Sequence, residues 1–274
     1  MKGVARREVR KVADGMLLAP VEDHIVAEEP LEIRAAGETL AITMRTPGAD
    51  RELAVGFLFA EGVIASRDDL GRVAHCGRPD QEGYGNVIDA VPGPGVSLDI
   101  DRLSATRRGT LTTAACGVCG RRSVDDVIAR CAPLPIVRAS MGTATILAAV
   151  DGLRDRQPNF ARTGGIHGAA LHDQEGRVAA AFEDIGRHNA VDKVVGAMLL
   201  AGRIPGSEAA LLVVSGRASY EVVQKASAAR VPVVASVSAA SSLAVDLARA
   251  AGITLCGFVR NRSMTVYSHP ERIR

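Results

Sequence analysis

Residues 209–236, AALLVVSGRASYEVVQKASAARVPVVAS, decide the fold. The apolar runs 209–214 and 231–236 each predict a short buried strand, and the segment between them, 218–230, predicts a helix. A strand, a helix and a second strand in close succession are typical of parallel strands that are joined by a crossover helix.

The same alternation continues on both sides of this stretch. Residues 168–182 predict a hairpin and 183–202 turn into a helix, whereas 238–252 predict a helix that ends at Gly252. Strands are expected again over 253–259 and 264–268. We therefore expect an α/β domain over residues 135–274, whose sheet has parallel pairs at its centre and is covered by helices.

The first 105 residues predict a smaller α+β domain. Residues 31–45 read as two strands around a turn at Gly37, Asp50 is expected to cap a helix through Ile64, and 86–100 suggest further strands. A flexible connecting segment, 106–134, is expected to join the two domains.

Composition excludes several classes of protein. The chain has 274 residues, of which 47% are hydrophobic, so it is long enough for two cores. A net charge of +2 and an aromatic content of 3% argue against nonspecific nucleic-acid binding. The basic start lacks the apolar core of a secretory signal, and the longest uncharged run, 231–245, is interrupted by Pro232. We expect a cytoplasmic protein that does not enter the membrane, with its five cysteines reduced.

Three loops that follow strands are candidates for a ligand site. The sequences EDIGRHN (183–189), SGRASYE (215–221) and SVSAASS (236–242) each open a helix. Ligands collect outside the carboxyl ends of strands in open α/β sheets, where helix N-termini offer N–H groups to anions. Arg187, Arg217 and the backbone of Gly216 suit a phosphorylated ligand, with hydroxyls from Ser215, Ser219, Ser236 and Ser238. The alternative is that serine and asparagine merely cap the helices.

Other polar residues near these loops keep two interpretations. His167 and His188 are candidates for acid, base or ligand chemistry, although each could be a hydrogen-bonded structural histidine. Asp192 and Lys193 are consistent with a solvated helix face.

The pair Cys116 and Cys119 in CGVCG (116–120) fits three chemistries. A zinc site needs four ligands, which His75 and Cys76 could complete. A dithiol redox couple is expected to open a helix, but glycines surround these thiols and the next helix is expected only from Ser123. The third chemistry is persulfide carriage, which the nearby cations favour because they stabilise a thiolate. These cations are Arg107, Arg108, Arg121 and Arg122, whereas Cys131 and Cys256 read as core residues.

Seven segments together resemble the formate dehydrogenase accessory sulfurtransferase family, FdhD. They run across nearly the whole chain: RTPGADRELAVGFLFAEGVI (45–64), CGVCG (116–120), TGGIHGAAL (163–171), EDIGRHNAVDK (183–193), VSGRASYEVVQKA (214–226), SVSAASSLAVDLA (236–248) and GITLCGFVR (252–260). The resemblance implies a homodimer whose C-terminal domain is a three-layer αβα unit similar to cytidine deaminases. A zinc deaminase itself is disfavoured, because no glutamate follows either histidine at two positions and no proline precedes Cys116.

The resemblance further implies a sulfur carrier, or sulfurtransferase. Sulfur would pass from a cysteine desulfurase as a persulfide on Cys116, with Cys119 assisting, to the molybdenum or tungsten of a bis-molybdopterin guanine dinucleotide cofactor. The sulfurated cofactor would then enter formate dehydrogenase, which requires it for activity. No permanently bound metal is expected, and the two rival hypotheses are a zinc-stapled cofactor chaperone and a dithiol oxidoreductase.

The resemblance also implies a cofactor-contact segment, FVRNRS (258–263). Phe258 would stack on guanine and Arg260 would bind phosphate, and the remaining residues of the segment are Val259, Asn261, Arg262 and Ser263.

Overall fold

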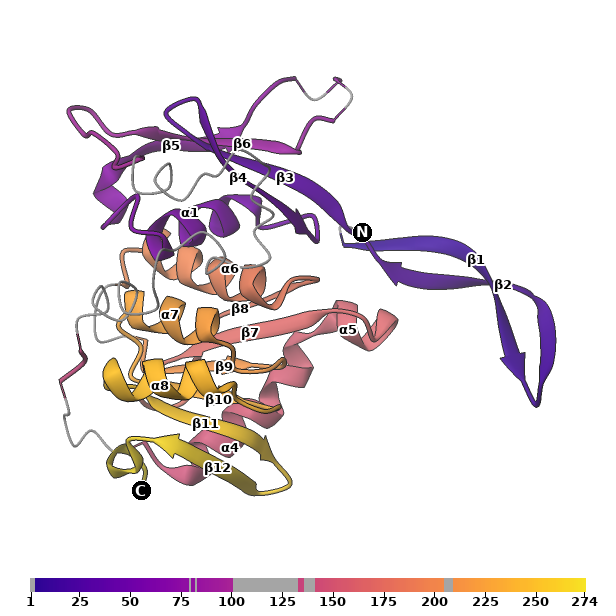
Figure 1. The fold of residues 1–274 in the computed structure, drawn as a ribbon. Helices are drawn as coiled ribbons and strands as arrows, with labels where there is room; N and C mark the ends of the chain where they lie inside the picture. Colours follow the sequence, from indigo (N-terminus) through magenta and orange to yellow (C-terminus); the bar gives the residue numbers. More distant parts are fainter. Residues whose placement is uncertain (1–2, 79, 82, 101–132, 136–140, 205–208) are drawn as a thin grey trace.

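The larger unit of the protein is a six-stranded sheet with helices on both faces. The structure is a computed structural model that describes residues 3–78, 80–81, 83–100, 133–135, 141–204 and 209–274. The strand order is β12-β11-β10-β9-β7-β8, and β10 is parallel to both β9 and β11. The predicted alternation and its central parallel pairs are confirmed (Figure 1). The strands are β7 (His167–His172), β8 (Val178–Asp184), β9 (Leu211–Val214), β10 (Val233–Ser236), β11 (Thr254–Arg260) and β12 (Ser263–Ser268).

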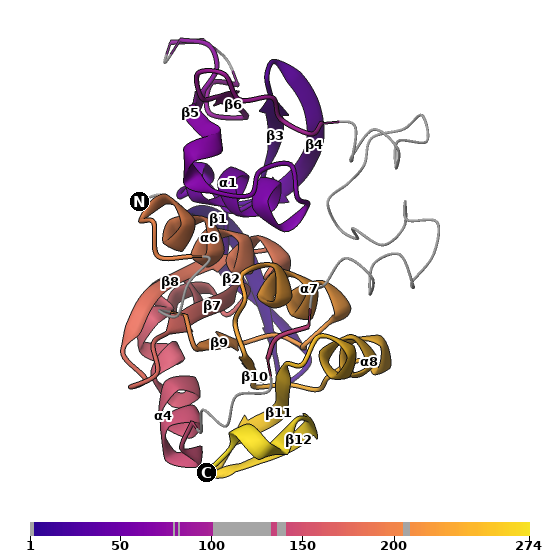
Figure 2. The ribbon, with the colours of Figure 1, turned by 90° about the vertical axis from the view of Figure 1, so that its left-hand side faces the viewer.

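Alternating residues of the central strands supply two separate cores. Leu212 and Val214 of β9 face the larger core, whereas Leu211 and Val213 face the smaller one beneath α4. Figure 2 shows α4 on one side of the sheet and α7 and α8 on the other. The helices are α4 (Thr143–Leu153), α5 (Pro158–Thr163), α6 (Arg187–Leu200), α7 (Tyr220–Ala228) and α8 (Ser242–Ala250). The predicted fold class, α/β with three layers in the larger unit, is therefore confirmed.

The smaller unit is a four-stranded sheet with one helix. Its strand order is β4-β3-β6-β5, and β3 and β6 are parallel. The elements are β3 (Glu29–Ala35), β4 (Glu38–Arg45), α1 (Asp50–Ala60), β5 (Leu70–His75) and β6 (Val87–Pro92). The domain boundary expected at residue 105 lies outside the described residues, as does nearly all of the connecting segment 106–134.

Asp50 does not cap α1 as the sequence suggested. Ala49 occupies the N-cap position with a positive φ of 55°, and Asp50 is the first helical residue. The Asp50 carboxylate instead accepts a hydrogen bond from Nε of the buried Arg45 at 3.0 Å. Asp50 therefore neutralises a buried guanidinium that also reaches the Gly85 carbonyl at 3.0 Å.

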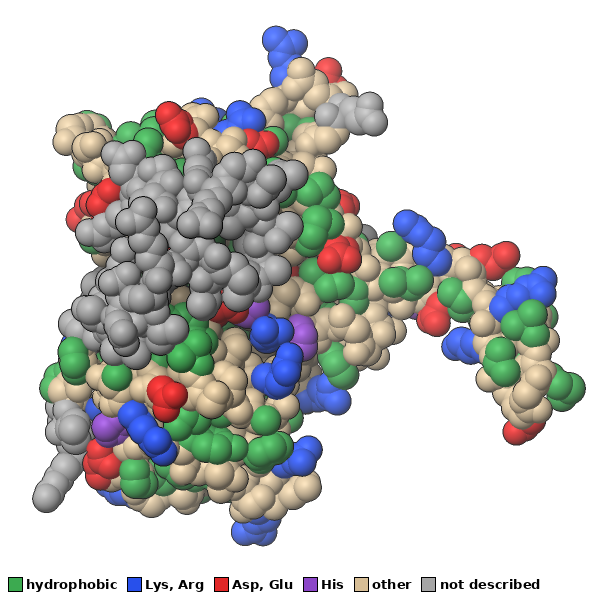
Figure 3. Space-filling view, in the orientation of Figure 1, with side chains coloured by type: hydrophobic (Ala, Val, Ile, Leu, Met, Phe, Trp, Pro, Cys, Tyr) green, Lys and Arg blue, Asp and Glu red, His purple; other side chains and the backbone are tan. Residues whose placement is uncertain are grey.

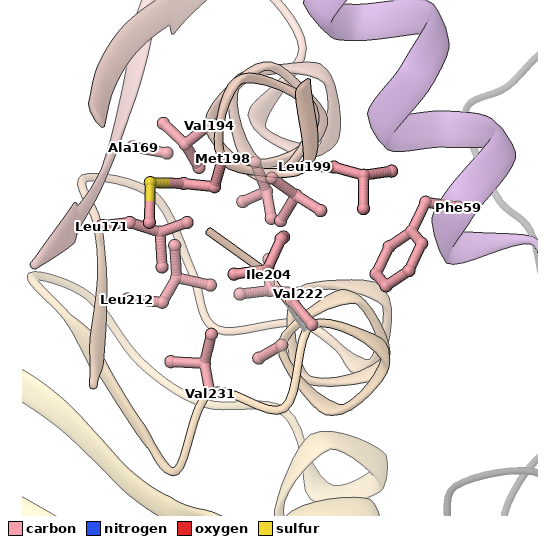
Figure 4. Close-up of a cluster of buried hydrophobic side chains, with 14 of the residues drawn as sticks. Phe59, Ala169, Leu171, Val194, Met198, Leu199, Ile204, Leu212, Val222 and Val231 are labelled. Atoms are coloured by element: carbon pink, nitrogen blue, oxygen red, sulfur yellow. The ribbon is translucent and has the colours of Figure 1, made fainter. Parts of the chain in front are cut away.

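The two units share one continuous core. Helix α1 lies against α6 so closely that a Cβ on Gly56 would be 2.0 Å from the Asp192 carbonyl oxygen. A Cβ on Gly196 would similarly be 1.9 Å from the Glu52 carbonyl oxygen. Figure 4 shows Phe59 of α1 pointing into the cluster of apolar side chains that contains Leu199 of α6. Glycines at the crossing therefore let the small unit pack on the helical layer of the large one.

A two-stranded ribbon, β1 (Val4–Ala13) and β2 (Met16–Val26), extends away from both units (Figure 1). Its turn is Asp14-Gly15, and both residues have positive φ, 53° and 77°. This is the geometry of a tight two-residue hairpin turn, for which Asp-Gly is a favoured sequence. The sequence analysis treated this region only as a basic start, although Asp14-Gly15 was the signal that could have revealed the hairpin.

Among the residues that the structure describes, no helix is long and apolar enough to cross a membrane.

Candidate functional site

The predicted ligand loops meet at one edge of the large sheet. Strands β8, β9, β10 and β11 run in the same direction, so their carboxyl ends lie together, on the right-hand side in Figure 1. The loops after β8, β9 and β10 lead into α6, α7 and α8. His167 begins β7 at the same edge, opposite Asp184. The strand topology therefore brings together segments that are far apart in the sequence.

The first loop, after β8, is fixed by the buried carboxylate of Asp184. That carboxylate accepts hydrogen bonds from the Gly186 backbone at 2.9 Å and from Asn189 Nδ2 at 3.0 Å. It also accepts from the backbone N–H of Thr46 at 3.2 Å and forms an ion pair with Lys193 at 2.6 Å. One side chain thus holds the N-terminus of α6 and ties the small unit to the site.

Asp192 and Lys193 are not on a solvated helix face, so that interpretation is wrong. Both are buried because α1 and α7 cover α6. Lys193 Nζ donates to the Thr46 carbonyl at 2.9 Å in addition to its contact with Asp184. Asp192 pairs with Lys225 of α7 at 2.7 Å, and burial raises the Asp192 pKa to about 6 despite that cation.

The serines of the second and third loops mostly bond to neighbouring backbone. Ser215 Oγ accepts from the Gly168 N–H at 2.9 Å, and Ser236 Oγ donates to the Gly216 carbonyl at 2.6 Å. Ser241 caps α8 by accepting from the Ala244 N–H, but Ser219 makes no such cap at α7. Simple helix capping therefore explains only one of these helix starts. Ser215 holds the second loop against β7, and Ser236 joins the third loop to the second.

His167 and Arg187 lie on either side of Gly216. A Cβ on Gly216 would be 3.2 Å from His167 Nδ1 and 3.6 Å from Arg187 Cβ. Burial lowers the pKa of His167, and the charges of Arg187 and His188 lower it further. The buried Nε of Arg187 has no hydrogen-bond partner among the described residues. His167 is therefore expected to be neutral at pH 7 beside a guanidinium with a free donor.

His188 points to a different partner. Its Nε2 contacts the Glu221 carboxylate at the start of α7, and both side chains are nearly buried. His188 therefore bridges α6 and α7, which matches the structural interpretation of this histidine.

An open cleft of about 620 Å³ lies at this edge of the sheet. The cleft is lined on one side by the predicted residues His167, Ser215, Val259 and Arg260, and on the other by α4, α5 and the link between them. Its volume is in the range of small-molecule sites, roughly 300–1,000 Å³. Figure 3, which views the molecule from the side of α7 and α8, shows Lys, Arg and His side chains gathered near the base of the ribbon.

The predicted cofactor-contact segment forms the hairpin between β11 and β12. Asn261 and Arg262 have φ of 51° and 58° and make a tight turn, with Arg260 opposite Ser263. Phe258 is 39% exposed, and the Arg260 guanidinium lies 5.7 Å from its ring centroid. Val259 is buried in the smaller core, so its side chain is structural although it borders the cleft.

The remaining predicted residues divide into two groups. Gly216 and Arg187 adjoin His167, but Arg217 and Phe258 are not among the residues that line the cleft. Cys116 and Cys119 lie outside the described residues, as do Cys131, the four flanking arginines and the helix expected from Ser123. The sequence analysis missed the far side of the cleft, formed by Asp151, Arg154, Gln157 and Phe160.

Cys76 and Cys256, the two cysteines that the structure describes, occupy different environments. Cys256 lies in the smaller core, where burial raises its pKa to about 12. Cys76 directly follows β5 and is partly buried, and it is not one of the residues that line the cleft. Within the described residues no cluster of three or more metal-binding side chains occurs.

Comparisons with known proteins agree with this architecture. The family model of the FdhD/NarQ family matches residues 26–274. The "Sulfur carrier protein FdhD" of Anaeromyxobacter dehalogenans is 58% identical over 92% of this chain and 89% of its own length. That of Streptomyces avermitilis is 47% identical over 98% and 95% of the two chains.

A solved structure supports the fold. The crystal structure from Desulfotalea psychrophila, described as that of a formate dehydrogenase accessory protein, superposes with a TM-score of 0.76 at 24% identity. It covers 99% of this chain and 100% of its own. Because the family model and these relatives extend over most of its length, the chain belongs to the FdhD/NarQ family.

Proposed function

We propose that this protein is a sulfur carrier that supports the maturation of formate dehydrogenase. The observation that carries the proposal is family membership together with the 58% identity to a protein named as a sulfur carrier. The cleft at the carboxyl ends of the strands also supports the proposal, because it could bind the molecule that receives the sulfur.

Cys116 and Cys119 are the cysteines best suited to carry sulfur. Cys256 is unsuited, because a thiol with a pKa near 12 is protonated at neutral pH and buried in the core. The segment around Cys116 and Cys119 contains four arginines, and nearby cations favour the reactive thiolate. We assign the persulfide to Cys116 and an assisting role to Cys119.

The proposed transfer proceeds in two balanced steps. The Cys116 thiolate attacks the outer sulfur of a persulfide on a cysteine desulfurase, whose own cysteine leaves as a thiolate. The Cys119 thiolate then attacks the inner sulfur of the Cys116 persulfide. This attack forms a Cys116–Cys119 disulfide and releases hydrosulfide toward the pterin-bound metal. Two electrons from an external dithiol restore both thiols.

The proposed sulfur acceptor is the bis-molybdopterin guanine dinucleotide cofactor, in its molybdenum or tungsten form. The protein would bind this cofactor as a substrate. Arg260 lines the cleft and suits a pyrophosphate oxygen, and Arg187 adds positive charge beside Gly216, which also adjoins the cleft-lining His167. Helix α6 adds N-terminal N–H groups at the same edge. A cleft of about 620 Å³ suits one nucleotide end of such a cofactor.

The zinc-stapled chaperone is less well supported. His75 would have to be a ligand, yet its Nε2 lies 3.3 Å from the Asp50 carboxylate and its Nδ1 lies 3.3 Å from the Val87 carbonyl. Zinc binding at His75 would break one of these contacts. The hypothesis of a dithiol oxidoreductase does not explain the cleft or the arginines that line it.

We also propose that the protein works as a homodimer in the cytoplasm. The ribbon supports a dimer, because Val12, Leu17, Val21 and Ile25 are between 43% and 67% exposed on an otherwise isolated pair of strands. Two copies that pack these apolar residues together would bury them. A reducing compartment suits thiols that must stay free between transfers.

The proposal is tested by complementation in cells that lack their own carrier. Wild-type protein should restore formate dehydrogenase activity, whereas the Cys116→Ala, Cys119→Ala double variant should not. A Cys256→Ala variant is the matched control and should retain activity. Full activity with the double variant would overturn the proposal, and about one zinc per chain bound by the thiols would favour the chaperone.

A further inference from the structure

We propose that the ribbon of one copy of the protein reaches across to a second copy and places its tip, residues 12–18, in a groove beside α5 of that copy. The inference rests on the proposed homodimer and specifies where the ribbon binds. The groove and the cleft have Arg154, Gln157, Phe160 and Gly164 in common. A tip in the groove therefore gives each cleft a wall from the other chain.

The ribbon needs a partner because it forms a sheet of two strands only. A two-stranded hairpin is marginally stable in water unless further strands or a packed face support it. At the tip, Val12, Met16 and Leu17 are 67%, 66% and 61% exposed. Apolar side chains gathered at the far end of an isolated arm indicate a surface that another molecule covers.

One face of the ribbon is apolar along its length. Val9 lies opposite Val21 and Ala5 lies opposite Ile25, and both pairs share a face because they are four residues apart along each strand. Two ribbons can pack through this face around a two-fold axis that crosses them, which places the tip of one beside the base of the other. An axis along the ribbons would instead bring the two Asp14 carboxylates together, which like charges disfavour.

The base of the ribbon is attached to α5. Nη2 of Arg162 on α5 lies 3.3 Å from Nε2 of His24 on β2, and a Cβ on Gly165 would be 3.5 Å from Val26 Cγ2. Figure 1 shows the ribbon leaving the body of the protein on the side of α5. A tip that lies beside the ribbon base of the second copy therefore also lies beside α5 of that copy.

An open groove of about 670 Å³ runs along α5. It combines an apolar wall with an excess of positive charge, two guanidiniums against one carboxylate. The apolar residues are Pro158, Phe160 and Ala161, and the charged residues are Arg154, Arg162 and Asp155.

The tip complements this groove in charge and in polarity. Asp14 is the one charged residue among 12–18, and the others are apolar or glycine. Asp14 is exposed and forms no ion pair within the described part of the chain. Its carboxylate suits the Arg154 guanidinium of the second copy, while Leu17 suits the Phe160 ring.

The size of a ribbon pair also calls for the groove. Ten residues at about 3.3 Å each make the ribbon about 33 Å long. Two strands about 4.8 Å apart present a face about 10 Å wide, so two packed ribbons bury roughly 700 Å² together. A stable dimer buries about 1,200–2,000 Å². Ribbon packing alone falls short of this range, and the two symmetric contacts between tip and groove add the missing area.

Analytical ultracentrifugation of the full-length protein over a range of concentrations tests the docking. Asp14→Arg places a cation against Arg154 of the second copy, and Arg154→Asp places a carboxylate against Asp14. Each variant should raise the Kd of the dimer at least about tenfold, because both contacts of the symmetric dimer then join like charges. Glu38→Arg reverses an exposed carboxylate beside the Gly37 turn and is the matched control, which should dimerise like wild type.

A mixture of Asp14→Arg and Arg154→Asp shows whether the contact joins two copies. In the mixed dimer each tip meets a groove of opposite charge. The mixture should therefore form a dimer at a concentration at which neither variant dimerises alone. Recovery of the dimer also shows that both variants are folded.

The outcomes separate the docking from the proposed function. If Arg154→Asp dimerises like wild type, or if the mixture gains nothing over the separate variants, the docking is wrong while the proposed dimer stands. If wild type is a monomer at about 100 µM, the docking and the proposed dimer are both wrong, and the tip is a surface for a different protein. The sulfur-carrier proposal is tested separately, by the Cys116→Ala, Cys119→Ala variant.

Discussion

Replacing Lys193 by methionine tests how the candidate site is held in place. The substitution keeps the apolar stem of the side chain but removes a charge that is 2.6 Å from the Asp184 carboxylate, with both side chains almost fully buried. It also removes the donor to the Thr46 carbonyl at 2.9 Å. Removing one partner of a buried pair costs about 3–5 kcal/mol, because the other charge stays buried without compensation.

The structure places the cost at the lower end of that range. Asp184 keeps three other donors, from Thr46, Gly186 and Asn189, which continue to stabilise its charge. We therefore expect the free energy of unfolding to fall by about 3 kcal/mol, which is a change of roughly a hundredfold or more in the unfolding equilibrium. Urea denaturation at pH 7 measures this directly.

A double-mutant cycle separates the pair from the packing. Asp184→Asn together with Lys193→Met removes both charges and should be less destabilised than the sum of the two single variants. A loss below about 1 kcal/mol for Lys193→Met would refute the reasoning, because removing one partner should leave the Asp184 charge buried without its cation.

Three further predictions concern other parts of the molecule. Burial lowers the pKa of His172, so the unfolded chain takes up a proton before the folded chain as the pH falls below about 6.5. The free energy of unfolding should therefore fall, by at most about 1.4 kcal/mol per pH unit. His172→Gln should show a smaller loss in urea denaturation at low pH, and an unchanged pH dependence would contradict this. Gly56→Ala should destabilise the protein by about 1–3 kcal/mol, because the new Cβ would meet the Asp192 carbonyl oxygen. The control Gly152→Ala should be neutral or stabilising, because a Cβ there would have nothing within 4 Å. Equal thermal midpoints for the two variants would argue against the close α1–α6 crossing. Leu17→Lys on the ribbon should convert the proposed dimer to a monomer, as measured by light scattering, while the monomer itself stays folded with an unchanged thermal midpoint. A dimer that persists in this variant would show that the ribbon does not form the interface.

The large sheet could be predicted because its strands are short apolar runs between helices of clear periodicity. Residues 209–236 fold as expected, with β9, α7 and β10 in sequence. The meeting of the three candidate loops was also predictable, since parallel strands must place their carboxyl ends at one edge. Ser215 and Val237 of these loops line the cleft, together with His167 at the start of β7 and Arg260 at the end of β11.

Features that depend on contacts between distant segments could not be predicted. Asp192 and Lys193 resemble a solvated face in sequence, and only the packing of α1 and α7 on α6 buries them. The burial of Gln157 has no pattern in the sequence, because it follows from the contact of this side chain with Gly168 on β7.

The central claim is that Cys116 receives sulfur, and mass spectrometry of the intact chain tests it most directly. After incubation with a cysteine desulfurase and free cysteine, the wild-type chain should gain one sulfur atom that a reducing agent removes. Peptide mapping should place the sulfur on Cys116, and the Cys116→Ala, Cys119→Ala variant should gain none. Sulfur found on Cys76 or Cys256, or undiminished loading of the double variant, would contradict the account.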